Sequence, residues 1–179
     1  MFKSTHAKAF GKAFGLAALG AAVMVPLAFV ATPAQAAVAN GTLTVTATVQ
    51  ASCTITNATL GFGTIADLGA ATNGSTTFDV NCTKTTPYSI AMSDGQNGSS
   101  DTTRAMSDGT DTLKYQLYTD SGYSDVWAST CSGTPGTDCA YGTGIGTAQT
   151  INVYGTVAAG QNVEPSTAYS DSVTMTVTY

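Results

Sequence analysis

Four cysteines are the side chains in this sequence with the clearest chemistry, because thiols either bind metals or form disulfides. Their even number is typical of a protein that folds in an oxidising compartment, and they allow three pairings. Cys131 and Cys139 flank a loop rich in Gly, Pro and Thr, so a local bridge is natural and leaves Cys53 to pair with Cys82. No Cys-x-x-Cys spacing occurs, which disfavours a metal site. We expect two disulfides and no bound metal.

Carboxylates are the next candidates, because Asp94, Asp101, Asp108 and Asp111 crowd a stretch rich in Gly, Ser and Thr. Their spacing does not match the EF-hand calcium loop, so solvated loop carboxylates are the favoured interpretation. As a glycosidase pair the same acids lack an evident partner position or cleft. We therefore expect no catalytic residue and no cofactor, and the sequence does not predict an enzyme.

Aromatic residues offer one further candidate site. Trp127, with Tyr118 and Tyr123 nearby in the sequence, has the composition of a sugar-binding platform. Tryptophan is more often buried than displayed, so we expect Trp127 to belong to the core.

The first 36 residues have the pattern of a secretory signal peptide. Lys3, Lys8 and Lys12 precede an apolar run over residues 14–30, and residues 34–36 (Ala-Gln-Ala) give a small-x-small cleavage site. A transmembrane anchor is the alternative for that run, but Pro26 interrupts it. We expect cleavage after Ala36 and export.

The expected mature chain, residues 37–179, excludes several classes of function by composition. The one histidine of the sequence, His6, lies before the cleavage site, so histidine-dependent catalysis and most zinc sites are excluded. Three basic and eleven acidic residues remain, a formal net charge of −8. Such a surface repels phosphate backbones, so we expect no nucleic-acid binding.

The elements that position these residues are predicted to be strands. Apolar and polar residues alternate over short segments rich in Val, Ile, Thr and Tyr, and pairs such as Asn73-Gly74 and Asp108-Gly109 indicate turns between them. No segment shows an amphipathic helical period. The expected fold is all-β, a single immunoglobulin-like sandwich of about seven short strands. The strands are predicted over residues 43–55, 61–65, 76–82, 88–92, 113–118, 124–127, 150–157 and 172–179.

The first and last of these strands are unusual. The first alternates for thirteen residues, more than a globular strand usually has. Either its first half belongs to another molecule, or it is one long strand that bends or changes sheets. The last strand runs to the end of the sequence. A strand with almost nothing before it and another with nothing after it are typical of a domain that its neighbour completes, which predicts a polymer subunit.

Several short motifs occur in sequence along residues 37–179. They are residues 51–55 (Ala-Ser-Cys-Thr-Ile), 60–65 (Leu-Gly-Phe-Gly-Thr-Ile), 80–83 (Val-Asn-Cys-Thr), 104–106 (Arg-Ala-Met), 113–118 (Leu-Lys-Tyr-Gln-Leu-Tyr), 153–157 (Val-Tyr-Gly-Thr-Val), Pro165 and the tail 169–179. In this order and spacing the chain resembles the spore coat protein U domain family. That family includes the major subunits of archaic (Csu-type) chaperone–usher pili.

The resemblance implies an incomplete immunoglobulin-like sandwich that lacks its final strand. In such subunits an N-terminal donor strand fills the groove of the next molecule, after a periplasmic chaperone has held that groove and an outer-membrane usher has catalysed the exchange. It also implies a disulfide between Cys53 and Cys82, whereas the Cys131–Cys139 loop departs from the family pattern. The implied donor residues are Leu43, Val45, Ala47 and Val49, and the implied groove residues are Val173, Met175, Val177 and Tyr179.

The function implied by the resemblance is that of a structural pilin. The expected organisation is a signal peptide over 1–36, a donor segment over 37–49 and a sandwich over 50–179. Such subunits polymerise with copies of themselves or related pilins into cell-surface fibres for adhesion and biofilm formation. Two alternatives remain open: a stand-alone secreted binding module, which would not need residues 43–49, and a spore-coat or outer-envelope component.

Overall fold

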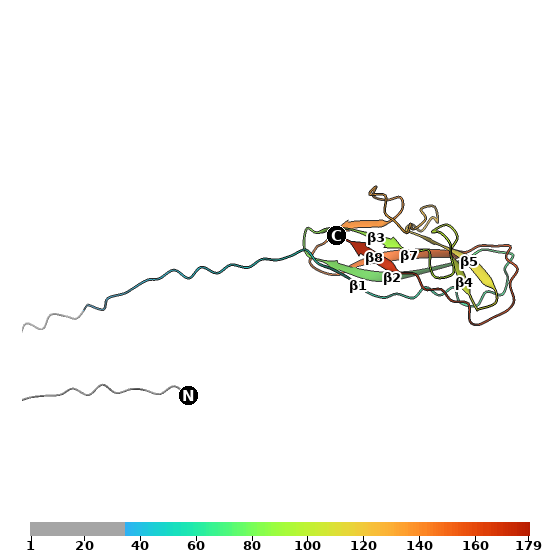
Figure 1. The fold of residues 1–179 in the computed structure, drawn as a ribbon, viewed down its shortest axis with the longest axis horizontal. Coiled ribbons are helices and arrows are strands. Elements are labelled where there is room, and N and C mark those ends of the chain that lie inside the picture. The colour runs from blue at the N-terminus through green and yellow to red at the C-terminus, as the bar shows by residue number, and fades with distance from the viewer. Residues whose placement is uncertain (1–34) are drawn as a thin grey trace, which may run out of the picture. The chain divides into compact units, whose positions relative to one another are not determined.

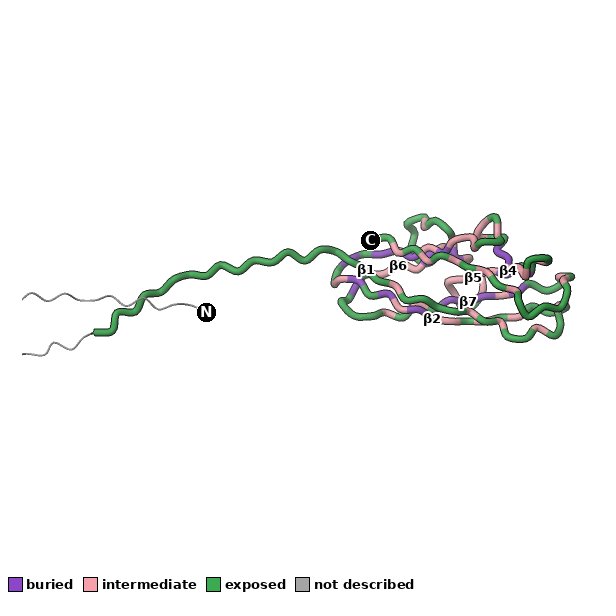
Figure 2. The backbone as a smooth tube through the Cα atoms, turned by 60° about the horizontal axis from the view of Figure 1, so that its bottom comes forward, coloured by how far each residue is buried: buried purple, intermediate pink, exposed green. Residues whose placement is uncertain are grey.

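The computed structural model describes residues 35–179, and all but the last two residues of the predicted signal peptide lie outside the described residues. A compact unit spans Thr46–Tyr179, and the described residues 35–45 do not belong to it. Residues 35–52 form no strand, and each of them is exposed (Figure 2). Across the described part of the chain, no helix is long and apolar enough to cross a membrane.

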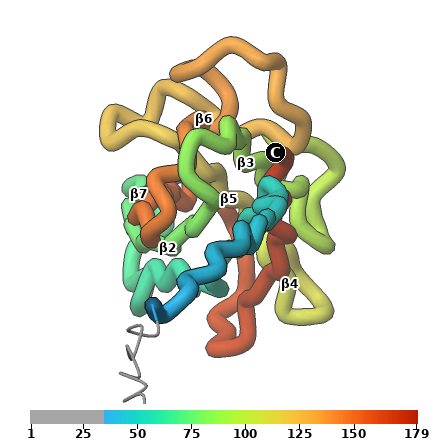
Figure 3. Tube along the Cα trace, turned by 90° about the vertical axis from the view of Figure 1, so that its left-hand side faces the viewer, coloured from blue at the N-terminus to red at the C-terminus, as the bar shows by residue number. Residues whose placement is uncertain are grey.

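In residues 35–179, eight strands form two antiparallel sheets, whose arrangement can be followed in Figure 1. The first sheet has the order β1-β2-β7-β5-β4, and the second has the order β6-β3-β8. β1 and β8 are therefore edge strands, one in each sheet. In the end-on view of Figure 3 the C-terminus lies beside β3, as the β3–β8 pairing requires. The strands are β1 (Cys53–Ile55), β2 (Thr72–Cys82), β3 (Pro87–Met92), β4 (Ala105–Ser107), β5 (Thr112–Tyr118), β6 (Ala140–Thr143), β7 (Gln149–Val157) and β8 (Met175–Thr178).

The core lies between the two sheets, because the alternating strands turn one side of each sheet inward. In β5, for example, Leu113, Tyr115 and Leu117 are buried, and the residues between them are exposed or half-buried. Trp127 is fully buried, and its Nε1 donates to the Ile90 carbonyl at 3.0 Å. The all-β sandwich of immunoglobulin-like type is thus confirmed, and Trp127 is a core residue as predicted.

Four predicted strands are absent or shortened. Of residues 172–179 only Met175–Thr178 forms a strand, β8. Of residues 43–55 only Cys53–Ile55 forms a strand, because only these three residues are in ladder register with β2. Residues 61–65 alternate but pair with no neighbour. Residues 124–127 contribute one bridging pair, Tyr118 with Val126. Alternation thus identified segments with an apolar side, but a strand also needs a backbone partner.

Two short strands were not predicted, and one predicted turn is wrong. β4 and β6 were not predicted, since three or four residues are too few to show a period. Asn73-Gly74 is not a turn: both residues lie in β2, where Gly74 pairs with Gly155 of β7. This glycine pair leaves the inner side of the first sheet free for other side chains to approach.

Both expected disulfides are present. Cys53–Cys82 joins β1 to β2 with a Cα–Cα distance of 4.1 Å, and Cys131–Cys139 closes the loop before β6 with a Cα–Cα distance of 5.7 Å. Among the described residues no cysteine is free.

Candidate functional site: a cleft between the two sheets

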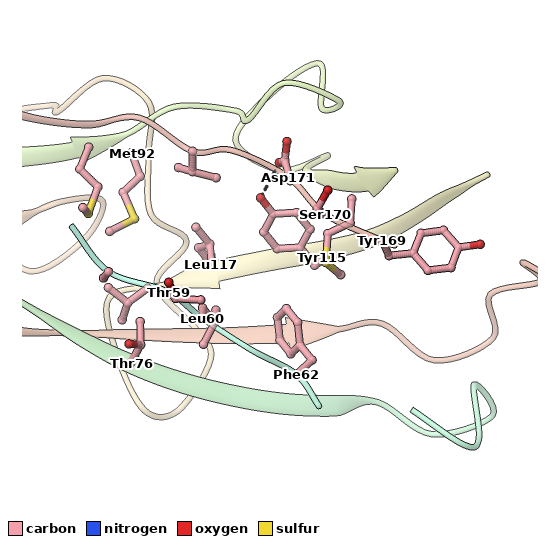
Figure 4. A pocket seen from close by; sticks show the side chains of 15 residues that line it. Thr59, Leu60, Phe62, Thr76, Met92, Tyr115, Leu117, Tyr169, Ser170 and Asp171 are labelled. Atoms are coloured by element: carbon pink, nitrogen blue, oxygen red, sulfur yellow. Dashed lines mark hydrogen bonds between the residues drawn. The ribbon is translucent and has the colours of Figure 1, made fainter. Parts of the chain in front are cut away.

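An open cleft lies between the inner side of the first sheet and the segment that leads into β8, the edge strand of the second sheet (Figure 4). Its volume is about 410 Å³. One wall is the segment after β1, and the other is the segment that leads into β8. The lining side chains are mainly apolar. They come from Ala58, Thr59, Leu60, Phe62, Thr76, Met92, Met106, Tyr115, Leu117, Val153, Tyr169, Ser170, Asp171, Val173 and Met175.

Much of the backbone on both walls is left without partners, although Ser170 of the wall that leads into β8 pairs with Ser107 of β4. Within the described chain, residues 57–67 and 171–173 make no backbone–backbone hydrogen bond. β8 pairs with β3 on one side only, and no strand of the described residues pairs with its other side. Unpaired N–H and C=O groups along an edge are a template for another strand. The cleft therefore offers hydrogen-bond partners as well as apolar surface.

The wall that leads into β8 carries an inward row at every second residue. Tyr169, Val173, Met175 and Val177 are half-buried and pack against the core, Asp171 is half-buried as well, and the even-numbered residues between them are exposed. Of the four predicted groove residues, Val173 and Met175 line the cavity, Val177 packs on the core outside it, and Tyr179 is 57% exposed. These side chains stop at half burial because no strand covers them.

Leu60 and Phe62 form the opposite wall by lying over two glycines. A Cβ built on Gly155 would come within 2.5 Å of Leu60 Cδ2, and one on Gly74 within 3.3 Å of both side chains. Only glycine permits this approach to the inner side of the first sheet. The Gly74–Gly155 pair thus makes room for a wall held by side chains rather than by a ladder of hydrogen bonds.

One end of the cleft is polar. Asp171 occupies a place in the otherwise apolar inward row, and its Oδ2 accepts a 2.6 Å hydrogen bond from Tyr115 Oη (Figure 4). Its Oδ1 accepts from the backbone N–H of Gln96 at 2.8 Å and from Asn97 Nδ2 at 3.2 Å. Burial raises the pKa of Tyr115 far above its usual range, and the hydrogen bond to Asp171 adds to this, so Tyr115 stays a donor.

Sequence reasoning missed Asp171 and Tyr115. They are 56 positions apart and meet only in the folded chain. The available signal was the place of Asp171 in the alternating row, two residues before Val173.

The predicted donor residues are all displayed to solvent. Leu43 is 86% exposed, Val45 and Val49 are each 81% exposed, and Ala47 is also exposed. Large apolar side chains in regular alternation are rarely left on a surface without a partner.

The other candidate sites gain no support. The residues 35–179 hold no group of three or more Cys, Asp or Glu side chains placed to bind a metal ion. Asp108 instead accepts the N–H groups of Thr110 and Asp111 in the β4–β5 turn, which lowers its pKa. Tyr118 and Tyr123 pack edge to face, with ring centroids 5.6 Å apart.

Comparison with known proteins places this fold in a family. The sequence profile of the Spore Coat Protein U domain matches residues 39–176. "Protein U" of Myxococcus xanthus is 34% identical over 164 residues, which cover 82% of this chain and 88% of that protein. One chain of the CsuC–CsuE chaperone–tip adhesion subunit pre-assembly complex, from the archaic chaperone–usher Csu pili of Acinetobacter baumannii, matches with 26% identity and a TM-score of 0.47. That match covers 74% of this chain and only 40% of the other. By its profile match and its relation to Protein U, this protein belongs to the spore coat protein U domain family.

Proposed function

We propose that this protein is a structural pilin subunit of an archaic chaperone–usher pilus that polymerises by donor-strand complementation. Residues 41–49 of one copy insert as a strand into the cleft of the next copy. The observation that carries the proposal is the cleft itself, an apolar cavity between two unpaired edges. A chain with a place for one more strand also carries an exposed segment with the alternation of a strand.

The length and polarity of the segment fit the cleft. Nine extended residues span about 30 Å, close to the span of the wall over residues 169–178. With Leu43, Val45, Ala47 and Val49 turned inward, the threonines at 42, 44, 46 and 48 face solvent. The backbone of the inserted strand pairs with the free edge of the segment that leads into β8 and of β8 itself, as in other cases of strand addition.

Burial supplies a durable joint. Covering the four donor side chains contributes roughly 5–9 kcal/mol, an upper value because a free donor segment is not fully extended. Each ladder hydrogen bond adds about 1 kcal/mol net. The joint needs no covalent bond.

The proposal implies a route and partners. A signal peptide over residues 1–36 exports the chain, a periplasmic chaperone covers the cleft until assembly, and an outer-membrane usher exchanges the chaperone for a donor strand. The product is a cell-surface fibre that serves adhesion and biofilm formation. The family match supports this route, and the open cleft supplies the reason a chaperone is needed.

A spore-coat or outer-envelope component is a second candidate, favoured by the family's description and by the relation to Protein U. It would use the same sandwich without an usher. The two candidates separate by whether strand exchange is required for assembly.

The test is Val45→Asp, with Val38→Asp as the matched control. Both valines are 81% exposed in the extension, but Val38 lies outside the alternating row. Val45→Asp is expected to abolish fibres seen by electron microscopy while the chaperone still captures the subunit, because a carboxylate cannot be buried in the cleft. Val38→Asp is expected to assemble normally. Normal fibres from Val45→Asp would contradict the proposal.

A further inference from the structure

Two rows of side chains each contain one exception. The inward row of the cleft reads Tyr169, Asp171, Val173, Met175 and Val177, with a single carboxylate among apolar residues. The donor row reads Leu43, Val45, Ala47 and Val49, with a single small residue among branched ones. If the donor segment fills the cleft, as in the proposed function on which this inference rests, the polar exception of one row must meet a residue of the other.

Asp171 cannot be covered by a large apolar side chain without cost. Its carboxylate already accepts three hydrogen bonds, two on Oδ1 and one on Oδ2, which leaves Oδ2 with a free acceptor site at the cleft. A leucine or valine placed against it would remove water and return no donor. An alanine methyl leaves space beside it for a water molecule that keeps the site satisfied.

The carboxylate also cannot move aside. It lies against the backbone of Gly95, where an added Cβ would collide with Asp171 Oδ2. Gln96 and Asn97 of the same loop hold it from one side, and Tyr115 of β5 holds it from the other. The polar point of the cleft is therefore fixed before any strand arrives.

We propose that Ala47 of the inserted strand lies opposite Asp171 of the receiving copy, and that this pairing sets the register of the joint. In an antiparallel strand Val45 then lies opposite Val173, Leu43 opposite Met175 and Val49 opposite Tyr169. A slip of one residue turns the threonines inward. A slip of two residues keeps the apolar side inward but sets Val45 or Val49 against the carboxylate.

The position of the cavity supports this register independently. Its wall runs from Tyr169 to Met175, and neither Val177 nor Tyr179 lines it. Pairing Ala47 with Asp171 sets all four donor side chains against residues 169–175, where the empty volume is. A register two residues further toward Tyr179 would leave part of that volume unfilled.

The experiment measures how donor and cleft variants couple. The receiving protein is the exported chain, residues 37–179, with Val45→Asp to disable its own donor. The probes are synthetic peptides of residues 39–51, and the readout is the dissociation constant. On this protein the Ala47→Leu peptide is expected to bind at least roughly tenfold more weakly than the unchanged peptide. Adding Asp171→Ala to the protein is expected to remove most of that penalty. As the control, the penalty for Val45→Ala in the peptide is expected to be the same with and without Asp171→Ala.

Disulfide trapping covers the case in which Asp171→Ala fails to fold. A peptide with Val45→Cys is expected to cross-link to Val173→Cys in the protein several-fold faster than a peptide with Ala47→Cys does, since directly opposite residues have the closest Cβ atoms.

The outcomes separate the two proposals. The register is overturned if the Ala47→Leu peptide binds as well as the unchanged one, if its penalty persists with Asp171→Ala, or if trapping favours position 47 against Val173. In each case the peptide still binds, and donor-strand complementation stands. Absence of any binding by the unchanged peptide overturns the proposed function and the register together.

Discussion

Around Trp127 the core is filled by side chains of the same sandwich, and we call this the closed region. Between Leu60 and Met175 the core is open to solvent, and we call this the open region. Arg104 shows how complete the first region is: it is fully buried, and five N–H donations go to the carbonyls of Met92, Ser93, Asp101 and Trp127 and to Gln116 Oε1. Burial lowers the pKa of this guanidinium, but its full set of acceptors makes the buried position tolerable.

The region between Leu60 and Met175 has the same kinds of residue, but its side chains and backbone groups do not all find partners within the subunit. Its apolar row remains half-buried, and much of the backbone along its two walls remains unpaired. The two regions share one core, so the difference is one missing strand rather than a poorer sequence. A mutation in the closed region should therefore act on folding, and one in the donor segment should act on assembly.

Trp127→Ala is expected to cause the largest loss of stability, and it acts on the closed region. It removes a fully buried ring and the hydrogen bond to the Ile90 carbonyl, for a loss of about 3–5 kcal/mol. Urea unfolding of the chain with Val45→Asp measures it. Ile145→Ala, at a position that is 56% exposed, is the control and should stay within about 0.5 kcal/mol. Equal effects from the two would mean that the closed region is not a packed core.

Gly155→Ala tests the wall of the open region from inside the sheet. The new methyl meets Leu60 and Phe62, so these side chains must move, and overpacking of this kind costs about 1–3 kcal/mol. Gly61→Ala is the matched control, because its Cβ would have no neighbour within 4 Å. Similar unfolding curves for the two variants would show that Leu60 and Phe62 do not rest on the glycine pair.

Leu43→Ala separates folding from assembly. Leu43 is exposed in the free chain, so its loss should leave the stability of the subunit unchanged. The donor peptide should bind more weakly by about 1.5–2 kcal/mol, because less apolar area is buried in the cleft. Thr44→Ala, on the other side of the strand, should bind like the unchanged peptide. Affinity loss for Thr44→Ala alone would reverse the assignment of the two sides.

The smallest expected effect is a loss of stability at low pH, and it comes from Asp120, outside the cleft. The pKa of Asp120 is lowered chiefly by the backbone N–H of Asp125, with further hydrogen bonds from Ser124 and Gly122. Its folded pKa therefore lies below the unfolded value of about 3.9. The stability it contributes is full above that value and is lost as the pH falls through the folded pKa. Thermal unfolding from pH 7 to pH 2 should show a smaller acid loss for Asp120→Asn than for the unchanged chain.

The closed region could be predicted from the sequence better than the open one. Residues 76–82, 88–92, 113–118 and 150–157 lie within β2, β3, β5 and β7, because each has a regular period and a partner within its own chain. Residues 43–52 and 61–65 alternate as well but pair with no strand among the described residues, because alternation alone does not say whether a segment finds a partner within its own molecule.

The candidate site divides in the same way. The apolar row at Val173, Met175 and Val177 is visible as alternation and is brought to the core as predicted. The polar end of the cleft cannot be predicted from the sequence, because Tyr115 and Asp171 lie far apart along the chain. The pairing of Gly74 with Gly155 cannot be predicted either, for the same reason. Both contacts depend on the order of the strands in the sheets, and the alternation within a single strand gives no information about that order.

The proposal that one strand is missing, and that residues 41–49 replace it, is tested most directly with two proteins of residues 37–179 that carry Val45→Asp. One of them also carries an unchanged copy of residues 41–49, joined to Tyr179 by a flexible linker. An antiparallel strand beside β8 can return directly from that end. We expect the extended protein to be a monomer that unfolds roughly 10–30 °C higher. Equal unfolding temperatures for two stable monomers would contradict the proposal.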